Sequence, residues 1–352
     1  MSFEDKIRKV VPYVPGEQPK QKNIIKLNTN ECPYPPAQGV QEKLKNFRYE
    51  DLRLYPDPDA SDITKALANY YKVDEDNIFV GVGSDDVISM AFMTFFNSKS
   101  PILFPNITYS FYEVWADLHK VPYKKIPLTD DFRIKKEDYF VENGGIIFPN
   151  PNAPTGIYED LDMIEEIVAK NSDVVVIIDE AYIDFGGTSA LPLIEKYDNL
   201  LVVQTFSKSR AMAGMRIGFA FGSKKLIGYL KDVKFSFNSY TMNRPSIECA
   251  KASIEDDVYF KDTCKKIIKT RQNTEDSLKN LGFTFPKSEA NFIFAKHDKI
   301  KAKVLLDELK KRGIFVRYFD KDRIDNYLRI TIGTDDEMKA LIKAFEEIIK
   351  EN

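Results

Sequence analysis

Six short apolar runs, separated by segments with helical patterning, are the feature that most constrains the fold of this chain. Each run consists almost entirely of apolar residues, rather than alternating with polar ones as a strand with one wet face does. Runs of this kind between helices are typical of strands buried on both faces of a mainly parallel sheet. They occupy residues 78–82, 102–104, 146–148, 174–178, 200–204 and 217–221. We therefore predict an α/β domain.

The segments outside these runs differ in texture. The first fifty residues are rich in proline and polar groups, which predicts an irregular arm that packs on other parts of the chain. A helix is predicted from Ser61, a capping residue, because Ile63 and Leu67 follow at helical spacing. Residues 247–282 predict one long charged helix, and strand-like runs and an amphipathic C-terminal helix follow. Since 352 residues exceed most single cores, this last part predicts a second, smaller α+β domain.

Composition narrows the class of partner. Fifty-one Lys plus Arg against 54 Asp plus Glu leave a net charge of −3, which favours small molecules over nucleic acid or a membrane surface. The sequence has neither a signal-peptide pattern nor a membrane-spanning run, so we expect a cytoplasmic protein. Cys32, Cys249 and Cys264 are widely spaced and suit reduced thiols, and with only His119 and His297 besides, no metal site is expected.

Ligands of open parallel sheets bind at the carboxyl ends of the strands, so the residues after each run are the candidates for function. GVGSDD (81–86) turns from a strand into a helix, whose free N–H groups would receive a phosphate. A dinucleotide-binding turn would require a third glycine where Asp86 stands. The segment therefore favours a phosphate group over a dinucleotide.

Two further strand ends carry charged side chains. Asp179 ends an apolar strand, where a carboxylate is costly unless it meets a cation, such as a protonated pyridine nitrogen, or serves as a cap or ion pair. Lys208 is either a surface lysine or a nucleophile that forms a Schiff base. The flanking strands and small residues favour the second role, and Thr205, Ser207 and Arg216 suit a phosphate.

A fourth strand end, NPNAPTG (150–156), is a turn-forming stretch. Asn152 within it is able to donate a hydrogen bond to a phenolate oxygen. The stretch is equally compatible with a plain turn.

Together these motifs resemble the fold-type I aminotransferases and, within them, the histidinol-phosphate aminotransferase family. The likeness runs from Tyr13 to Thr334. The motifs that carry it are LNTNECPYPP (27–36), RLYPDP (53–58), GSDD (83–86), DEAY (179–182), TFSK (205–208), AGMRIG (213–218) and YLRITIGT (327–334). The resemblance implies a large α/β domain with a mainly parallel seven-stranded sheet, and pyridoxal 5′-phosphate as cofactor. On this basis we expect an N-terminal arm (1–26), a large domain (47–245) and a small α+β domain (27–46 and 246–352).

The resemblance also implies roles for residues around the cofactor. Lys208 would be the Schiff-base lysine and the base for proton transfer, Asp179 would bind the pyridine nitrogen, and Tyr182 would bind the ring's O3′ oxygen. The family pattern has asparagine just before PTG, but here Ala153 stands there and Asn152 precedes it. Either Asn152 and Tyr182 share the oxygen, or Tyr182 holds it alone. The residues implied at the cofactor's phosphate or ring face are Ser84, Asp85, Tyr109, Thr205, Ser207 and Arg216.

Substrate and partner follow from the same likeness. Tyr13 and Asn30 would lie near the substrate, and Arg329, assisted by Arg317, would hold its anionic group. Tyr55 would reach the phosphate of the cofactor in a neighbouring subunit, which implies a homodimer. The implied reaction converts L-histidinol phosphate and 2-oxoglutarate into imidazole-acetol phosphate and L-glutamate, a step of histidine biosynthesis.

Other functions remain open on the sequence alone. An aromatic or broad-specificity amino-acid aminotransferase would use the same scaffold, and a phosphothreonine decarboxylase is a related possibility. A catalytically silent binding module would require the reactive residues to be missing, yet the lysine, aspartate, tyrosine and arginine are all present.

Overall fold

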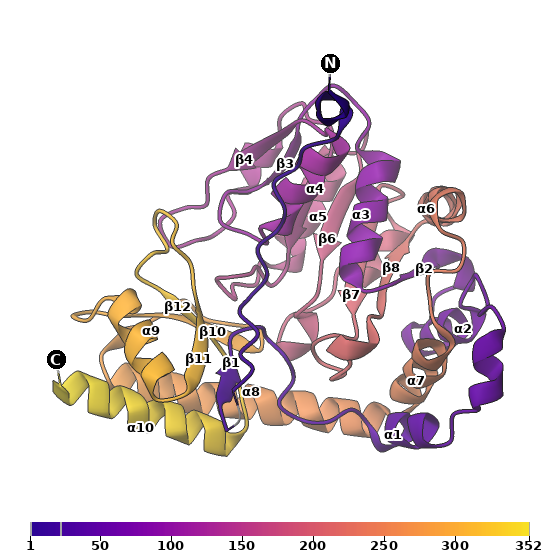
Figure 1. Ribbon diagram of the computed structural model, residues 1–352. Coiled ribbons are helices and arrows are strands. Elements are labelled where there is room, and N and C mark those ends of the chain that lie inside the picture. The colour runs from indigo at the N-terminus through magenta and orange to yellow at the C-terminus, as the bar shows by residue number, and fades with distance from the viewer. Residues whose placement is uncertain (1, 22, 352) are drawn as a thin grey trace.

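The computed structural model describes residues 2–21 and 23–351, and its larger sheet has seven strands (Figure 1). In spatial order they are β2 (Ile78–Gly81), β8 (Gly218–Gly222), β7 (Leu200–Thr205), β6 (Val176–Asp179), β5 (Ile146–Pro149), β3 (Ile102–Pro105) and β4 (Tyr123–Ile126). Strand β8 runs opposite to the other six strands. The expected α/β fold with a mainly parallel seven-stranded sheet is confirmed.

Helices cover both faces of this sheet, because alternate residues of each strand point to opposite sides. In β6, Ile177 packs on one side and Ile178 on the other. The first side is covered by α3 (Ser84–Phe95), α4 (Phe111–His119) and α6 (Lys224–Phe237). The second is covered by α2 (Ser61–Tyr71), α5 (Leu161–Lys170) and α7 (Arg244–Glu255), with α1 (Gln38–Lys45) against α7. The apolar runs of the sequence are thus buried on both sides.

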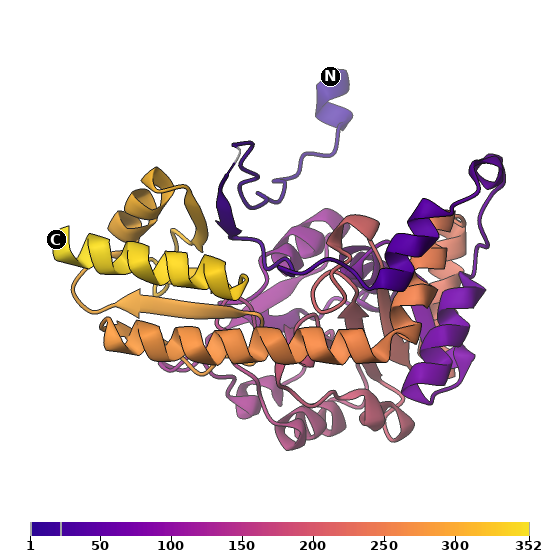
Figure 2. The same ribbon diagram turned by 90° about the horizontal axis from the view of Figure 1, so that it is seen from below.

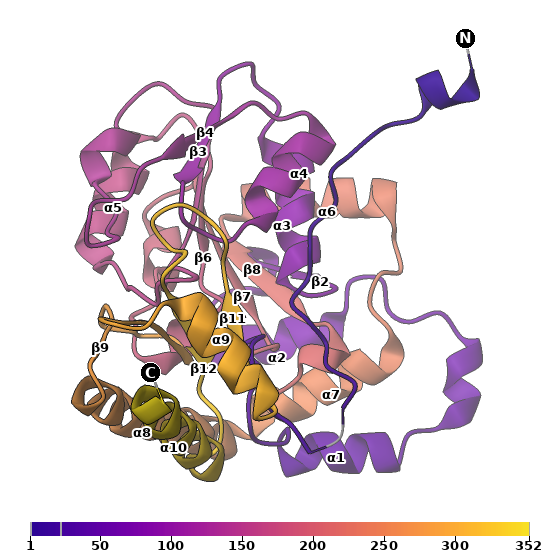
Figure 3. The ribbon, with the colours of Figure 1, turned by 60° about the vertical axis from the view of Figure 1, so that its left-hand side comes forward.

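The smaller sheet has five strands and a separate core. Its order is β1 (Ile25–Leu27), β11 (Ile314–Tyr318), β12 (Leu328–Thr331), β10 (Phe292–His297) and β9 (Phe283–Thr284). The helices beside it are α8 (Asp257–Asn280), α9 (Ala302–Lys311) and α10 (Asp335–Glu351), with α8 and α10 lying side by side (Figure 2). Since β1 pairs in parallel with β11, the chain enters this sheet soon after its N-terminal arm, whose first residues project from the body (Figure 3).

Seven short 3-10 helices complete the described elements. They are η1 (Phe3–Lys6), η2 (Tyr49–Arg53), η3 (Glu75–Asn77), η4 (Lys136–Tyr139), η5 (Ile183–Phe185), η6 (Leu191–Glu195) and η7 (Ala213–Met215). No helix of the described residues has the length and apolar character to cross a bilayer. The cytoplasmic location stays a prediction.

Two local expectations were wrong. The single helix over 247–282 is two helices, because the chain breaks at Asp256 and its side chain accepts a hydrogen bond from the Tyr259 backbone N–H at 3.1 Å. Ser61 does not cap α2; instead the Asp57 carboxylate accepts from the Ser61 backbone N–H at 2.8 Å. In both places an aspartate satisfies a free N–H group at a helix start. The domain boundaries stay predictions, with α1 and α7 packed in the core of the larger sheet.

Candidate active site

A cavity of about 190 Å³ lies at the carboxyl ends of the central strands, where the loops after β2, β5, β6 and β7 meet the loop after β1. The residues that line it are Thr29, Glu31, Ser84, Asp85, Tyr109, Pro149, Ala153, Asp179, Ala181, Tyr182, Thr205, Ser207, Lys208, Ala213 and Arg216. The structure therefore brings together residues that are separated by up to 187 positions, from Thr29 to Arg216 (216 − 29). Parallel topology explains this, since it collects all strand ends at one edge.

Lys208 presents its amine in this cavity. Its Nζ donates a hydrogen bond to the Thr29 carbonyl at 3.3 Å and lies 5.8 Å from the centre of the Tyr182 ring. Lys208 forms no ion pair with any residue that the structure describes. The amine is therefore oriented by neutral groups and is available to react with a carbonyl carbon.

Asp179 is held at the end of β6 by two hydrogen bonds. The Tyr112 hydroxyl donates to its Oδ2 at 2.8 Å, and the Ala181 backbone N–H donates to its Oδ1 at 3.2 Å. Burial raises the pKa of Asp179 to about 6, although both hydrogen bonds lower it. A cationic partner in the cavity would restore the ionised form, as a protonated ring nitrogen does.

An anion cradle forms where α3 begins beside β8. A Cβ at Gly218 would lie 2.2 Å from the Ser84 backbone nitrogen, so only glycine lets the helix start come this close. The Arg216 guanidinium donates to Asp85 Oδ2 at 3.3 Å, and the hydroxyls of Thr205 and Ser207 are 3.0 Å apart beside it. Helix N–H groups, hydroxyls and a guanidinium are the donors that a phosphate needs.

Two tyrosines border the space between the lysine and the cradle. Tyr109 donates its hydroxyl hydrogen bond to Asp85 Oδ1 at 2.9 Å, while burial and then Asp85 raise the pKa of Tyr109 well above its ordinary value. The Tyr182 oxygen accepts from Asn30 Nδ2 at 2.9 Å. Both rings are thus fixed in place, as a stacking surface and an oxygen-binding group must be.

Arg317 and Arg329 face each other across β11 and β12. Arg329 donates to the Asn28 carbonyl at 3.1 Å, and its buried Nε has no hydrogen-bond partner among the described residues. Burial and the neighbouring Arg317 lower the pKa of Arg329. Tyr13 lies close by with its ring stacked on Phe111 at 4.3 Å, and burial raises its pKa against the opposing effect of both arginines. Two adjacent guanidiniums without a carboxylate partner form a site for an anion.

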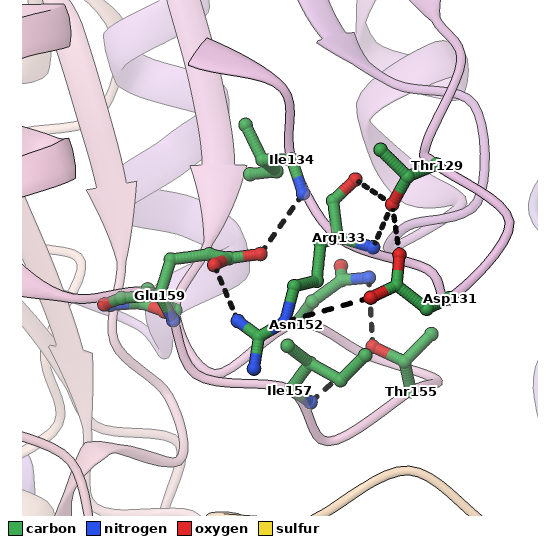
Figure 4. Close-up of polar contacts among 9 residues, drawn as sticks. Thr129, Asp131, Arg133, Ile134, Asn152, Thr155, Ile157 and Glu159 are labelled. Atoms are coloured by element: carbon green, nitrogen blue, oxygen red, sulfur yellow. Dashed lines mark hydrogen bonds and ion pairs between the residues drawn. The ribbon is translucent and has the colours of Figure 1, made fainter.

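Asn152 is not among the residues that line the cavity, and its contact with the cofactor stays a prediction. Its Nδ2 donates to Thr155 Oγ1 at 3.1 Å (Figure 4). The same Nδ2 also donates to the Ile107 carbonyl at 3.0 Å, and its Oδ1 accepts from Thr108 at 3.0 Å. The amide of Asn152 makes these hydrogen bonds because the irregular loop has backbone and hydroxyl groups that no helix or strand satisfies. Ala153 lines the cavity instead.

Tyr55 also lies outside this cavity. Its side chain is 79% exposed and stacks on Tyr240 with ring centres 4.7 Å apart. Within one chain it therefore makes no contribution to the site.

Three residues whose side chains carry polar groups at the site were missed by sequence reasoning. Tyr112 holds Asp179, while Thr29 and Glu31 line the cavity from the loop after β1. Tyr112 lies three positions after Tyr109 at the start of α4, and this helical spacing was the available signal. Nothing in local spacing connects Thr29 or Glu31 to Lys208.

These residues fit pyridoxal 5′-phosphate group by group. The amine of Lys208 suits the cofactor's aldehyde, and the buried carboxylate of Asp179, with its raised pKa, suits the pyridine nitrogen. Tyr182 suits the ring oxygen, and the anion cradle suits the phosphate. A ligand that uses all of these residues must carry all four chemical groups in one molecule. Fold and site together define a pyridoxal-phosphate-dependent enzyme of fold type I.

The chain belongs to the family "Aminotransferase class I and II", whose sequence model matches residues 22–345. It is 52% identical over 350 residues to the histidinol-phosphate aminotransferase of Clostridium beijerinckii, covering 99% of this chain and 98% of that protein. It is 54% identical over 349 residues to that of Brachyspira hyodysenteriae, with 99% of each chain covered. The expected aminotransferase class, cofactor and resemblance are confirmed.

A solved structure supports the same fold. The histidinol-phosphate aminotransferase of Sinorhizobium meliloti, determined in complex with pyridoxal 5′-phosphate, superposes with a TM-score of 0.85 at 24% identity. The match covers 93% of this chain and 91% of that one.

Proposed function

We propose that this aminotransferase converts L-histidinol phosphate and 2-oxoglutarate into imidazole-acetol phosphate and L-glutamate, in histidine biosynthesis. The observation that carries the proposal is the pair of guanidiniums on β11 and β12, Arg317 and Arg329, which face each other without a carboxylate partner among the described residues. One substrate presents a phosphate and the other a carboxylate, and arginine binds both with paired hydrogen bonds. The names of the relatives that are about 50% identical over nearly the whole chain support this substrate.

The chemistry divides between the cofactor and the chain. When bound, pyridoxal phosphate supplies an electron sink for the pair of electrons left on the substrate's α-carbon. Lys208 Nζ takes the proton from that carbon, and the Thr29 carbonyl orients the amine for it. Asp179 holds a proton on the ring nitrogen, with Tyr112 fixing the carboxylate. Tyr182, oriented by Asn30, binds the ring oxygen.

The same residues serve both halves of the reaction. L-Histidinol phosphate and 2-oxoglutarate would occupy the site one after the other, so one site must accept both acidic molecules. Arg329 and Arg317 would hold whichever anion is present, while Tyr13 would cover it from the arm. No second anion site is required.

The proposed active form is a homodimer. Apolar side chains are exposed around η2 and at the end of α6: Tyr49 is 77%, Leu52 61%, Tyr55 79% and Phe237 70% exposed. The Tyr55–Tyr240 contact joins the two stretches into one patch. Exposed apolar side chains gathered in this way favour an interaction surface, and a second copy would cover it while Tyr55 reached the partner's cofactor.

A panel of amino donors tests the proposal. The protein loaded with cofactor is mixed with L-histidinol phosphate, phenylalanine, tyrosine or phosphothreonine, and loss of the visible cofactor band and any release of carbon dioxide are followed. We expect L-histidinol phosphate to react with the highest kcat/KM and no carbon dioxide to form. Faster reaction with phenylalanine or tyrosine would instead identify an aromatic aminotransferase, and carbon dioxide from phosphothreonine a decarboxylase.

A further inference from the structure

The loop after β1 contacts three functional parts of the site: the anion-binding arginine, the reactive lysine and the tyrosine expected at the ring oxygen. Three consecutive residues make hydrogen bonds to three different functional groups, and the fourth, Glu31, lines the cavity itself. The hydrogen bonds join Asn28 to Arg329, Thr29 to Lys208 and Asn30 to Tyr182. The residue at the reactive amine therefore lies between the residue at the anion site and Glu31.

The two oxygens of Glu31 have different surroundings. Oε2 accepts hydrogen bonds from Lys26 Nζ and from the Thr29 hydroxyl, the latter at 2.7 Å. Oε1 has no hydrogen-bond partner among the residues that the structure describes. The other carboxylates of the cavity differ, because both oxygens of Asp85 and both of Asp179 accept hydrogen bonds. Glu31 thus offers the one cavity carboxylate oxygen that is unpartnered within this part of the chain.

The carboxylate of Glu31 is ionised in this position. Burial raises its pKa, but the hydrogen bonds from Lys26 and Thr29 outweigh burial and hold the pKa below its ordinary value. A fixed negative charge with one free oxygen is an acceptor for an N–H group of a ligand. The two donors on Oε2 also fix which oxygen is free.

We propose that Glu31 determines specificity by accepting a hydrogen bond, through Oε1, from the imidazole N–H of L-histidinol phosphate. The inference rests on the function proposed above. In that substrate the α-carbon carries two arms, one ending in the phosphate and the other in the ring. The loop presents the matching contacts in the same order along the chain. Asn28 contacts Arg329 at the anion site, Thr29 contacts the reactive Lys208, and Glu31 follows.

The same geometry disfavours competing donors. A phenyl ring has no N–H group, so phenylalanine would leave an ionised oxygen unpaired beside an apolar ring, which is costly. Glutamate has no ring at all and is held by its carboxylates, so Glu31 contributes little to its binding. Glu31 therefore separates L-histidinol phosphate from phenylalanine without affecting glutamate.

The substitution Glu31→Gln tests this inference. Because Lys26 and Thr29 are donors, they retain the amide oxygen, and the amide NH2 group takes the place of Oε1. A donor then faces the ring N–H where an acceptor stood. The matched control is Glu166→Gln, which changes a glutamate of similar exposure that pairs with Lys136 on the surface. Ligand binding is measured with the cofactor-loaded form of both variants and of the unmodified protein.

Two unreactive ligands isolate the ring contact. 3-(Imidazol-4-yl)propyl phosphate and 3-phenylpropyl phosphate share the phosphate arm, lack the amino group, and differ in the ring. Their inhibition constants are measured at a pH of about 6, where an imidazole is largely protonated and both nitrogens donate, and again at a pH of about 8. The phenyl ligand corrects for titration of the phosphate and of the protein.

We expect Glu31→Gln to raise the inhibition constant of the imidazole ligand about 10- to 100-fold at the lower pH, and less at the higher pH. The KM for L-histidinol phosphate should rise with it, while the KM for glutamate, the constant for the phenyl ligand and all values for Glu166→Gln stay within about twofold. Equal weakening of both ligands, or no change for the imidazole ligand, would overturn the role of Glu31 alone. If the unmodified protein does not turn over L-histidinol phosphate, the proposed function fails and this inference falls with it.

Discussion

The Tyr112 hydroxyl donates a hydrogen bond at 2.8 Å to Oδ2 of Asp179, a residue 67 positions further along the chain. Both side chains are buried. The contact holds the carboxylate at the end of β6 in the orientation that a ring nitrogen requires, and it opposes the rise in pKa that burial causes. Tyr112 is therefore a positioning residue for the cofactor's electron-accepting ring.

Replacing Tyr112 with phenylalanine should weaken cofactor binding and catalysis. The change removes one hydrogen bond to a buried carboxylate, worth about 1.5 kcal/mol or more, so we expect about a tenfold loss in both cofactor affinity and kcat/KM. Titration of the cofactor-free protein with pyridoxal phosphate and steady-state kinetics measure the two. Tyr139→Phe is the control, because its buried hydroxyl has no hydrogen-bond partner among the described residues. An equal effect in the control would show that the loss reflects packing.

The stability of the cofactor-free protein should depend on the ionisation of Asp179. Its folded-state pKa of about 6 lies above the ordinary value of 3.8, so the folded state holds the proton more tightly than the unfolded state. Ionisation as the pH rises from about 4 to about 6 therefore removes about 3 kcal/mol of stability. We expect Asp179→Asn to be more stable than the unmodified protein towards urea at a pH of about 8, but not at about 4. The exposed Asp173→Asn should show no such difference, and stability of Asp179→Asn equal to the unmodified protein at both pH values would refute the assignment.

The central strands of the larger sheet were predictable because a strand that is buried on both faces consists of an uninterrupted run of apolar residues. In the larger sheet the exception is β4, which the sequence did not indicate. Lys124 and Lys125 in it are exposed, and β4 lies at the edge of the sheet, where charged residues prevent pairing with other chains. An edge strand thus lacks the apolar signal by which the central strands were found.

The residues of the site also divide into those that the sequence made predictable and those that it did not. Lys208 and Asp179 were predictable because each follows a recognisable strand, and parallel strands end at one edge. Thr29 was not, because its partner Lys208 is 179 positions away and the contact uses only a backbone carbonyl. The amide of Asn152 makes hydrogen bonds to Ile107 and Thr155, which no spacing in the sequence indicated, and its contact with the cofactor stays a prediction.

Arg329→Lys should impair recognition of both acidic substrates. Lysine keeps the charge but loses the planar fork that binds phosphate and carboxylate through paired hydrogen bonds. We expect KM to rise about 30-fold or more for L-histidinol phosphate and for 2-oxoglutarate, with cofactor affinity nearly unchanged. Arg312→Lys, at the end of α9 and paired with Glu308, is the control. An effect on only one of the two substrates would contradict a shared anion site.

Tyr55→Phe should lower cofactor affinity only if the active form is a dimer. Loss of one hydrogen bond to a phosphate predicts about a tenfold weaker affinity for pyridoxal phosphate. Tyr49→Phe provides a control in the same exposed stretch. Analytical ultracentrifugation of the holoenzyme should give twice the mass of the chain. A monomer whose cofactor affinity is insensitive to Tyr55→Phe would rule out the proposed contact between subunits.

The amine of Lys208 is expected to form a Schiff base with the aldehyde of the cofactor, and this bond is the most direct test of the site. Borohydride reduction of the holoenzyme fixes that bond, and mass spectrometry of a proteolytic digest then locates the added mass. We expect the pyridoxyl group on the peptide that contains Lys208, at that lysine. Modification at another lysine, with Lys208 unmodified, would contradict it.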